Sequence, residues 1–304
     1  MIGDTNEHSS PSDFSIQPVP EPQFLPSFTA EPPDPPMRFP NFADVGLAAI
    51  VLIFAGVLSA GLTQLALHLH LFGVVTKEQA TTEIHYTLGS QTAWYLLSLT
   101  GFLFLFPNFW HTSFFSGVEW SFAAAFRMRW HLFRAATFCV VLAILDSIAM
   151  PGPKDAPIDE VFRRKDAAWL MALFGTTFAP FFEELIFRGF LLPAFCTACD
   201  WAAERMTHRP ALWPDAEGRT QWTLPAMAVG SVLTSIPFAL MHSWQNGGSI
   251  GPFLLLVGVS MVLCWVRLGT RSLAASTIVH ASYNLLLFAL MFAGTDGFKH
   301  MDKM

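Results

Sequence analysis

Long apolar stretches recur along most of the chain, and they limit the possible folds more than any other feature of the sequence. Each stretch is close to the ~20 residues that an α-helix needs to cross the hydrocarbon core of a bilayer. Backbone amides find no water inside a membrane, so spanning segments are helices or closed barrels, and runs of this length favour helices. The expected spans lie at about 43–72, 84–110, 130–150, 166–201, 221–243, 251–267 and 272–293.

The composition also indicates a membrane protein. Hydrophobic residues make up 53% of the 304 residues, charged residues only 13%, and the mean hydropathy is +0.44. An ordinary soluble domain has ~25% charged residues. The sequence therefore predicts an all-α, multi-pass integral membrane protein, a helical bundle of seven or eight transmembrane helices. The number is open because the stretch at 167–201 is either one helix kinked near Pro193 or two segments.

The first 42 residues differ from the rest of the chain. They combine many prolines with acidic residues, and such a segment cannot bury enough apolar surface to fold. We expect a disordered, Pro-rich acidic tail over 1–42 and N-terminal transmembrane helices over 43–166. Because the tail holds most of the net charge of −6, the remainder is close to neutral. It offers a nucleic acid no electrostatic attraction, so no nucleic-acid partner is expected.

Three ionisable side chains stand within one of the most apolar parts of the chain: Glu183, Glu184 and Arg188. A charge in the hydrocarbon core costs about 3 kcal/mol or more on insertion scales, so these groups must be paired, solvated in a cavity, or used in chemistry. Glu184 and Arg188 are four residues apart on one helix face, where they can form an ion pair. Glu183 is rotated by about 100° from Glu184 and is available for another role.

Two later spans carry polar side chains at the same helical spacing. Phe238 and His242 share one helix face, and His280 and Asn284 share another. Buried polar groups need partners, and the charged residues around Glu183 are suitable ones. We therefore expect a shared interior site formed by three spans.

A free carboxylate, two imidazoles and an amide can hydrolyse a peptide bond without a covalent intermediate. Glu183, assisted by His242, would activate a water molecule, and His280 with the Asn284 amide would stabilise the oxyanion. A serine nucleophile is a poorer interpretation, because the strand-to-helix turn on which a Gly-x-Ser-x-Gly motif presents its serine is not expected in an all-helical bundle. A metal site is a more serious alternative, since glutamate and histidine bind zinc, but the His-Glu-x-x-His spacing is absent. The favoured interpretation has no metal and no cofactor.

The same residues resemble the motifs of the CAAX prenyl endopeptidase and bacteriocin-processing family, also called the CPBP or Abi family. Residues 183–188 look like its Glu-Glu-x-x-x-Arg motif, residues 238–242 like its Phe-x-x-x-His motif, and residues 280–284 like its His-x-x-x-Asn motif. The three motifs stand in the family's order, each in an apolar span. The resemblance implies an intramembrane glutamate-type endopeptidase with a catalytic core over 167–293, followed by a C-terminal tail over 294–304.

The resemblance also implies a role for each matching residue. The catalytic residues would be Glu183, His242, His280 and Asn284, and the supporting residues Glu184, Arg188 and Phe238. The implied partners are membrane lipids and a lipidated or membrane-associated peptide as substrate. Two other interpretations stay open: a non-proteolytic membrane scaffold or bacteriocin-immunity protein of the same fold, and a proton-relaying transporter. Internal repeats would favour a transporter, and we detect none in the sequence.

The connections between spans carry fewer signals. The aromatic stretch at 111–129 predicts a short helix lying in the membrane interface. The polar stretch at 200–220 is expected to be a surface insertion that lengthens the interval between two of the motifs. Cys196 and Cys199 form a Cys-x-x-Cys, but an apolar setting favours small buried residues over a redox pair.

Overall fold

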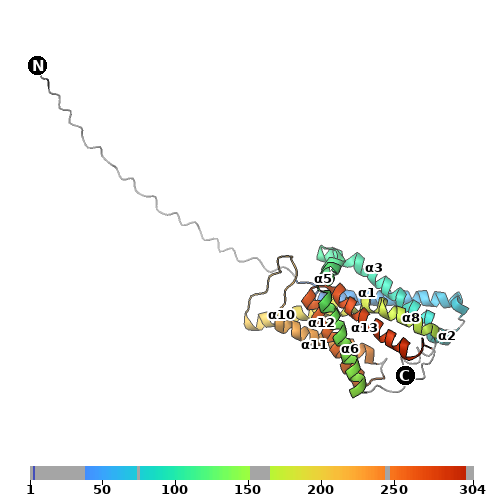
Figure 1. Ribbon diagram of the computed structural model, residues 1–304. Coiled ribbons are helices and arrows are strands. Elements are labelled where there is room, and N and C mark those ends of the chain that lie inside the picture. Colours follow the sequence, from blue (N-terminus) through green and yellow to red (C-terminus); the bar gives the residue numbers. More distant parts are fainter. Residues whose placement is uncertain (1–2, 4–37, 74–75, 151–164, 244–246, 299–304) are drawn as a thin grey trace. The chain divides into compact units, whose positions relative to one another are not determined.

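The computed structural model describes residue 3 and residues 38–73, 76–150, 165–243 and 247–298 (Figure 1). The expected tail over 1–42 therefore lies almost wholly outside the described residues, and so does most of the expected C-terminal tail. The chain divides into two units, Met1–Pro35 and Pro36–Met304. All of the structure considered below belongs to the second unit.

Regular structure in the described residues is entirely helical, as the apolar pattern predicts. Within these residues, seven helices are long and apolar enough to cross a membrane, which confirms the multi-pass helical bundle. They are α1 (Phe42–His68), α3 (Ile84–Trp110), α6 (Arg129–Ala149), the run Ala167–Thr207, α11 (Leu224–Ser243), α12 (Ile250–Thr270) and α13 (Leu273–Gly294).

The run that carries the glutamate pair is one long helix with two irregularities. Its parts are α8 (Lys165–Thr176), α9 (Phe178–Glu184), the π-helical segment η2 (Leu185–Leu191) and α10 (Leu192–Thr207). Thr177, with φ −124° and ψ −76°, interrupts the helix between α8 and α9. The π-helical segment ends just before Pro193, which has no N–H for the carbonyl four residues back and so disturbs an α-helical ladder. The stretch is therefore one helical run and not two separate segments, and its non-helical residue is Thr177.

Several helices end at residues other than those that the apolar pattern predicts. The first span ends at His68 and not near residue 72, because the chain turns through the left-handed residue His70 (φ 50°). The long helix continues past residue 201 to Thr207, since its last turns are amphipathic and need no fully apolar sequence. The connection that lies outside helices is therefore 208–223, which includes residues 208–220 of the expected insertion.

Short helices connect the spans. The expected interface helix at 111–129 is in fact two, α4 (Phe114–Gly117) and α5 (Phe122–Arg127), because the chain breaks at Glu119 with φ 55°. Between the first two spans lie η1 (Leu71–Gly73) and α2 (Lys77–Thr82), which the apolar pattern does not predict.

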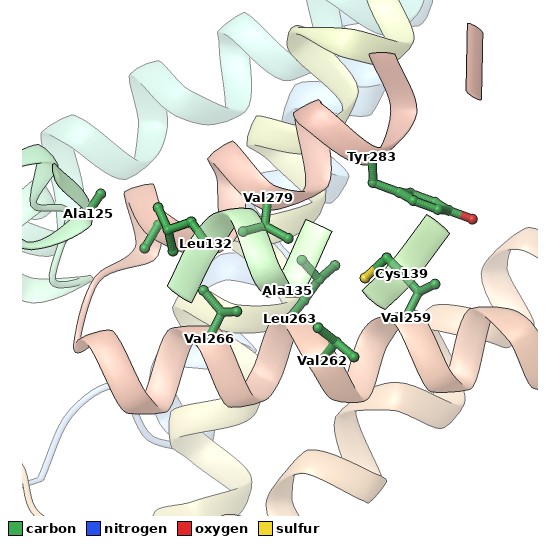
Figure 2. Close-up of a cluster of buried hydrophobic side chains, with 11 residues drawn as sticks. Ala125, Leu132, Ala135, Cys139, Val259, Val262, Leu263, Val266, Val279 and Tyr283 are labelled. Carbon is green, nitrogen blue, oxygen red and sulfur yellow. The ribbon is translucent and has the colours of Figure 1, made fainter. Parts of the chain in front are cut away.

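The π-helical segment lies where several spans meet. η2 contacts α1, α11, α12 and α13, in addition to its neighbours in the long helix. α13 in turn packs against α6, α8, α9 and α12. One cluster of buried apolar side chains joins α6, α12 and α13, with Leu132 and Cys139 facing Leu263 and Val279 (Figure 2). This packing buries most of η2 between four other spans.

Two acidic residues, Asp200 and the half-buried Glu119, attach the connections to the bundle. Asp200, fully buried on α10, accepts hydrogen bonds from Arg209 Nη2 at 3.0 Å and from the backbone N–H of Thr223 at 2.8 Å. Glu119 accepts hydrogen bonds from Arg267 Nη1 at 2.6 Å and from Arg271 Nη2 at 2.5 Å. The connection at 208–223 is thus anchored at both ends, and the α4–α5 corner is attached to the end of α12.

Candidate active site

Glu184 and Arg188 form a fully buried ion pair. Arg188 Nη1 donates to Glu184 Oε1 at 2.8 Å, and neither side chain has exposed surface. Arg188 Nη2 also donates to the carbonyl oxygen of Ser260 at 3.1 Å and to its hydroxyl oxygen at 2.6 Å. The guanidinium carbon lies 4.5 Å from the ring centre of Phe238, within the range of a cation–π contact. The arginine therefore connects η2 to both α11 and α12.

Glu183 lies between the two histidines. Its Oε2 is 3.6 Å from His242 Nε2 and 3.6 Å from His280 Nε2. These distances are too long for direct hydrogen bonds, and they leave the carboxylate close enough to share a bridging water with either ring. The Glu183 side chain is 14% exposed, whereas that of Glu184 is not exposed at all. Of the two adjacent carboxylates, Glu183 is the one with access to a substrate.

The other nitrogen of each imidazole is held by an acceptor. His242 Nδ1 is 2.8 Å from the carbonyl oxygen of Phe238, and His280 Nδ1 is 3.0 Å from Glu184 Oε1. A carbonyl oxygen and an ionised carboxylate can only accept, so both rings carry a proton on Nδ1. In the neutral rings Nε2 is then an acceptor, and both acceptors face Glu183. In that neutral state a water molecule between the carboxylate and the two rings can donate hydrogen bonds to them.

Phe238 forms an apolar wall of this site. It is 1% exposed, and its ring centre lies 4.8 Å from that of His242 and 5.9 Å from that of His280. Phe187 meets the same ring edge-on at 5.2 Å. The wall supports both imidazoles on one side and the guanidinium of Arg188 on the other.

Asn284 lies one helical turn beyond His280 on α13. Its Nδ2 donates to the carbonyl oxygen of Gly175 on α8 at 2.8 Å, just before the helix interruption at Thr177. An amide nitrogen carries two N–H groups, so this bond uses one of them. The contact attaches α13 to the long helix beside the site, and the expected oxyanion role of Asn284 would fall to the second N–H group.

Two residues of α3 belong to the surroundings of Glu183, although the motifs do not indicate them. The ring of Tyr95 stacks on Phe182, with centroids 4.1 Å apart and planes 15° apart. Gln91 Nε2 donates to the Tyr95 hydroxyl oxygen at 2.9 Å, so the pair lies against Phe182, the residue that precedes Glu183. Gln91 and Tyr95 have the same i, i+4 spacing as the recognised motifs, which is the signal that could have found them. The sequence does not show which span they face.

Among the described residues, no three His, Cys, Asp or Glu side chains are arranged to hold a metal ion. The side chains of Glu183, His242 and His280 lie close together, but they are not arranged as ligands of one metal ion. Cys196 and Cys264 are buried and Cys199 is partly buried, and each is a free thiol.

The comparison with protein families matches the same region. Residues 165–286 match the family model described as type II CAAX prenyl endopeptidase Rce1-like. Over these residues the chain is similar to the Rce1-like family. The Rce1-like segment contains all three motifs and ends two residues after Asn284. The fold is accordingly that of a CAAX-type intramembrane protease. Comparison with curated proteins and with solved structures gives no match.

The Rce1-like match does not extend over the whole bundle. It begins at α8, so α1, α3 and α6 lie outside the matched residues. Tyr95 and Gln91 on α3 nevertheless lie beside the Rce1-like motif residues. The N-terminal spans thus contribute to the surroundings of the site as well as to the packing of the bundle.

Proposed function

We propose that this protein is a glutamate-type intramembrane endopeptidase that cuts a prenylated or otherwise membrane-associated peptide. The observation that carries the proposal is the position of Glu183 Oε2, at 3.6 Å from Nε2 of both His242 and His280. The Rce1-like match supports the protease class and a membrane-associated substrate. The proposal extends that class to a mechanism and to a lipidated peptide.

Water activation is assigned to Glu183 and His242. A water molecule held by both groups transfers a proton to the Glu183 carboxylate while its oxygen attacks the scissile carbonyl carbon. The new C–O bond produces a tetrahedral oxyanion. Glu183 then returns the proton to the leaving nitrogen as the C–N bond breaks. The step needs no covalent enzyme intermediate and no metal ligand.

Stabilisation of the oxyanion is assigned to His280 and Asn284. In the proposed mechanism His280 has a proton on both ring nitrogens: Nδ1–H donates to Glu184, and Nε2–H donates to the oxyanion. Arg188 donates to the same Glu184 oxygen and so holds that carboxylate in place. The second N–H group of Asn284 is the other proposed donor. In this assignment Glu184 and Arg188 act through His280 and do not contact the substrate.

Cleavage of a farnesylated Cys-a-a-X peptide by the purified full-length protein tests the proposal. The wild type should release the C-terminal tripeptide, and Glu183→Gln should slow release by about 100-fold or more, since a general base contributes at least that much. A matched control is Arg205→Gln, because Arg205 is exposed and its guanidinium lies over Trp201. The control should cleave at the wild-type rate.

Three outcomes would contradict parts of the proposal. Absence of cleavage across several lipidated peptides would favour the non-proteolytic scaffold or immunity protein. Equal rates for wild type and Glu183→Gln would remove Glu183 from the mechanism. Loss of activity with a chelator, restored by zinc, would show that a metal takes part.

A further inference from the structure

A groove of about 870 Å³ lies between α6 and α12, away from the candidate active site. Two of its wall residues are strongly exposed, Phe138 by 53% and Trp265 by 60%, so the groove opens outward from the bundle. Ala135 and Val262, both visible in Figure 2, form its floor where the two helices meet. The remaining apolar lining residues are Leu142, Gly258 and Met261. None of these side chains belongs to the Glu183 site.

One end of the groove is basic. Its ionisable lining residues are His131 and Arg134, and Arg134 Nη2 donates to His131 Nδ1 at 2.8 Å. With Nδ1 accepting, the His131 proton is on Nε2, which can donate to a further group. No acidic residue is found among the described residues that line the groove. Arg129 is also exposed, and its described hydrogen bond goes to the carbonyl oxygen of Phe126 and not to a carboxylate.

The length of the groove matches one leaflet of a bilayer. His131 and Leu142, at its two ends on α6, are eleven residues apart. At about 1.5 Å per residue this separation is roughly 16 Å, against ~15 Å for half of a ~30 Å hydrocarbon core. Trp130 and Trp265, exposed by 69% and 60%, flank the basic end, as aromatic residues do at the level of the lipid headgroups. The basic end therefore lies at headgroup depth and the apolar end near the middle of the bilayer.

We propose that this groove is a binding site for one anionic phospholipid. The phosphate group would accept hydrogen bonds from the Arg134 guanidinium and from His131 Nε2, and an acyl chain would lie along the apolar part between Phe138 and Met261. The basic end carries positive charge that no lining carboxylate balances, which favours a lipid with net negative charge over a zwitterionic one. The site does not depend on proteolysis, and it lies between α6, which is outside the Rce1-like match, and α12, which is inside it.

Native mass spectrometry of the full-length protein, released from micelles containing equal amounts of phosphatidylglycerol and phosphatidylcholine, tests the site. We expect one phosphatidylglycerol to be retained in preference to phosphatidylcholine. Arg134→Gln should lower that preference by about fivefold, the effect of one basic residue at an anionic membrane surface. Met261→Trp, which fills the apolar part of the groove, should lower retention of both lipids. Arg205→Gln, a control that removes another exposed arginine, should retain phosphatidylglycerol as the wild type does.

The proposal is overturned if the wild type retains both lipids equally, or if Arg134→Gln keeps the wild-type preference. A loss of preference in Arg205→Gln equal to that in Arg134→Gln would also overturn it, because binding would then reflect general surface charge. Arg134 is exposed, so its substitution leaves the packing of the bundle intact. Retention of the lipid by a folded Met261→Trp variant would show that the groove is not where the acyl chain lies.

Discussion

Removal of the Arg188 guanidinium is the sharpest test of how the buried charges support the site. Arg188→Met keeps most of the side-chain length and removes the charge. Glu184 would then stay fully buried with His280 as its remaining described hydrogen-bond partner, and Ser260 would lose two donated hydrogen bonds. The variant thus creates an uncompensated carboxylate at the point where η2 meets α12.

The magnitude follows from the environment of the pair. Removing one partner of a buried ion pair costs about 3–5 kcal/mol, because the other charge is left without compensation. The pair has no exposed surface, so the upper half of that range applies. The lost hydrogen bonds to Ser260 are part of the same network and do not add independently. We expect Arg188→Met to lower the free energy of unfolding by about 4 kcal/mol.

A double variant separates charge compensation from packing. In Glu184→Gln with Arg188→Met the buried carboxylate is absent, so the double variant should be more stable than the sum of the two single effects predicts. The expected coupling is about 1–3 kcal/mol. Arg205→Gln is the control, since Arg205 is exposed and its loss should cost less than about 1 kcal/mol.

The assay is reversible unfolding in mixed detergent micelles, followed by intrinsic fluorescence. A loss below about 1 kcal/mol for Arg188→Met would refute the reasoning, because a buried pair broken on one side cannot be that weak. Additive single and double effects would also refute it, since they would show that Glu184 is stable without the arginine.

Two further predictions concern residues outside the three motifs. Tyr95→Phe keeps the ring that stacks on Phe182 and removes the hydroxyl that accepts from Gln91 beside the Glu183 segment; we expect wild-type unfolding and a kcat lower by about tenfold, with KM unchanged. An equal kcat would show that Tyr95 serves only to pack the bundle. Asp200→Ala removes the acceptor that holds both ends of the 208–223 connection, at a cost of about 1.5–3 kcal/mol. Trypsin should then cut at Arg209 faster than in the wild type, and an unchanged cutting rate would contradict the anchoring role.

Helix geometry made much of the site predictable. The pairing of Glu184 with Arg188 follows from their spacing, and the structure confirms it at 2.8 Å. The convergence of Glu183 with His242 and His280 was predicted from the need of buried polar groups for partners. These inferences needed only the rotation of about 100° per residue and the absence of water in the bilayer core.

Contacts between helices were not predictable in the same way. Ser260 receives two hydrogen bonds from Arg188, yet a lone serine in an apolar span has no distinguishing pattern. The spacing predicts the pairing of Glu184 with Arg188, but the contact of Glu184 with His280 depends on how α13 is turned toward the long helix. Tyr95 was missed for the same reason, because sequence periodicity identifies the polar face of a helix but not the helix opposite. The π-helical form of η2 also depends on tertiary packing.

That π-helical segment sets the relative rotation of the two halves of the long helix. A π turn closes its hydrogen bonds over five residues, where an α turn uses four, so η2 holds more residues than a regular helix of its height. A chain with one residue fewer in η2 would turn every side chain of α10 by about 100° relative to α9. Asp200 would then face away from the 208–223 connection, while Glu183 would still lie between His242 and His280. The π-helical segment therefore fixes the rotation of α10 relative to α9. As a result Glu183 on α9 faces the interior site, and Asp200 on α10 faces the 208–223 connection.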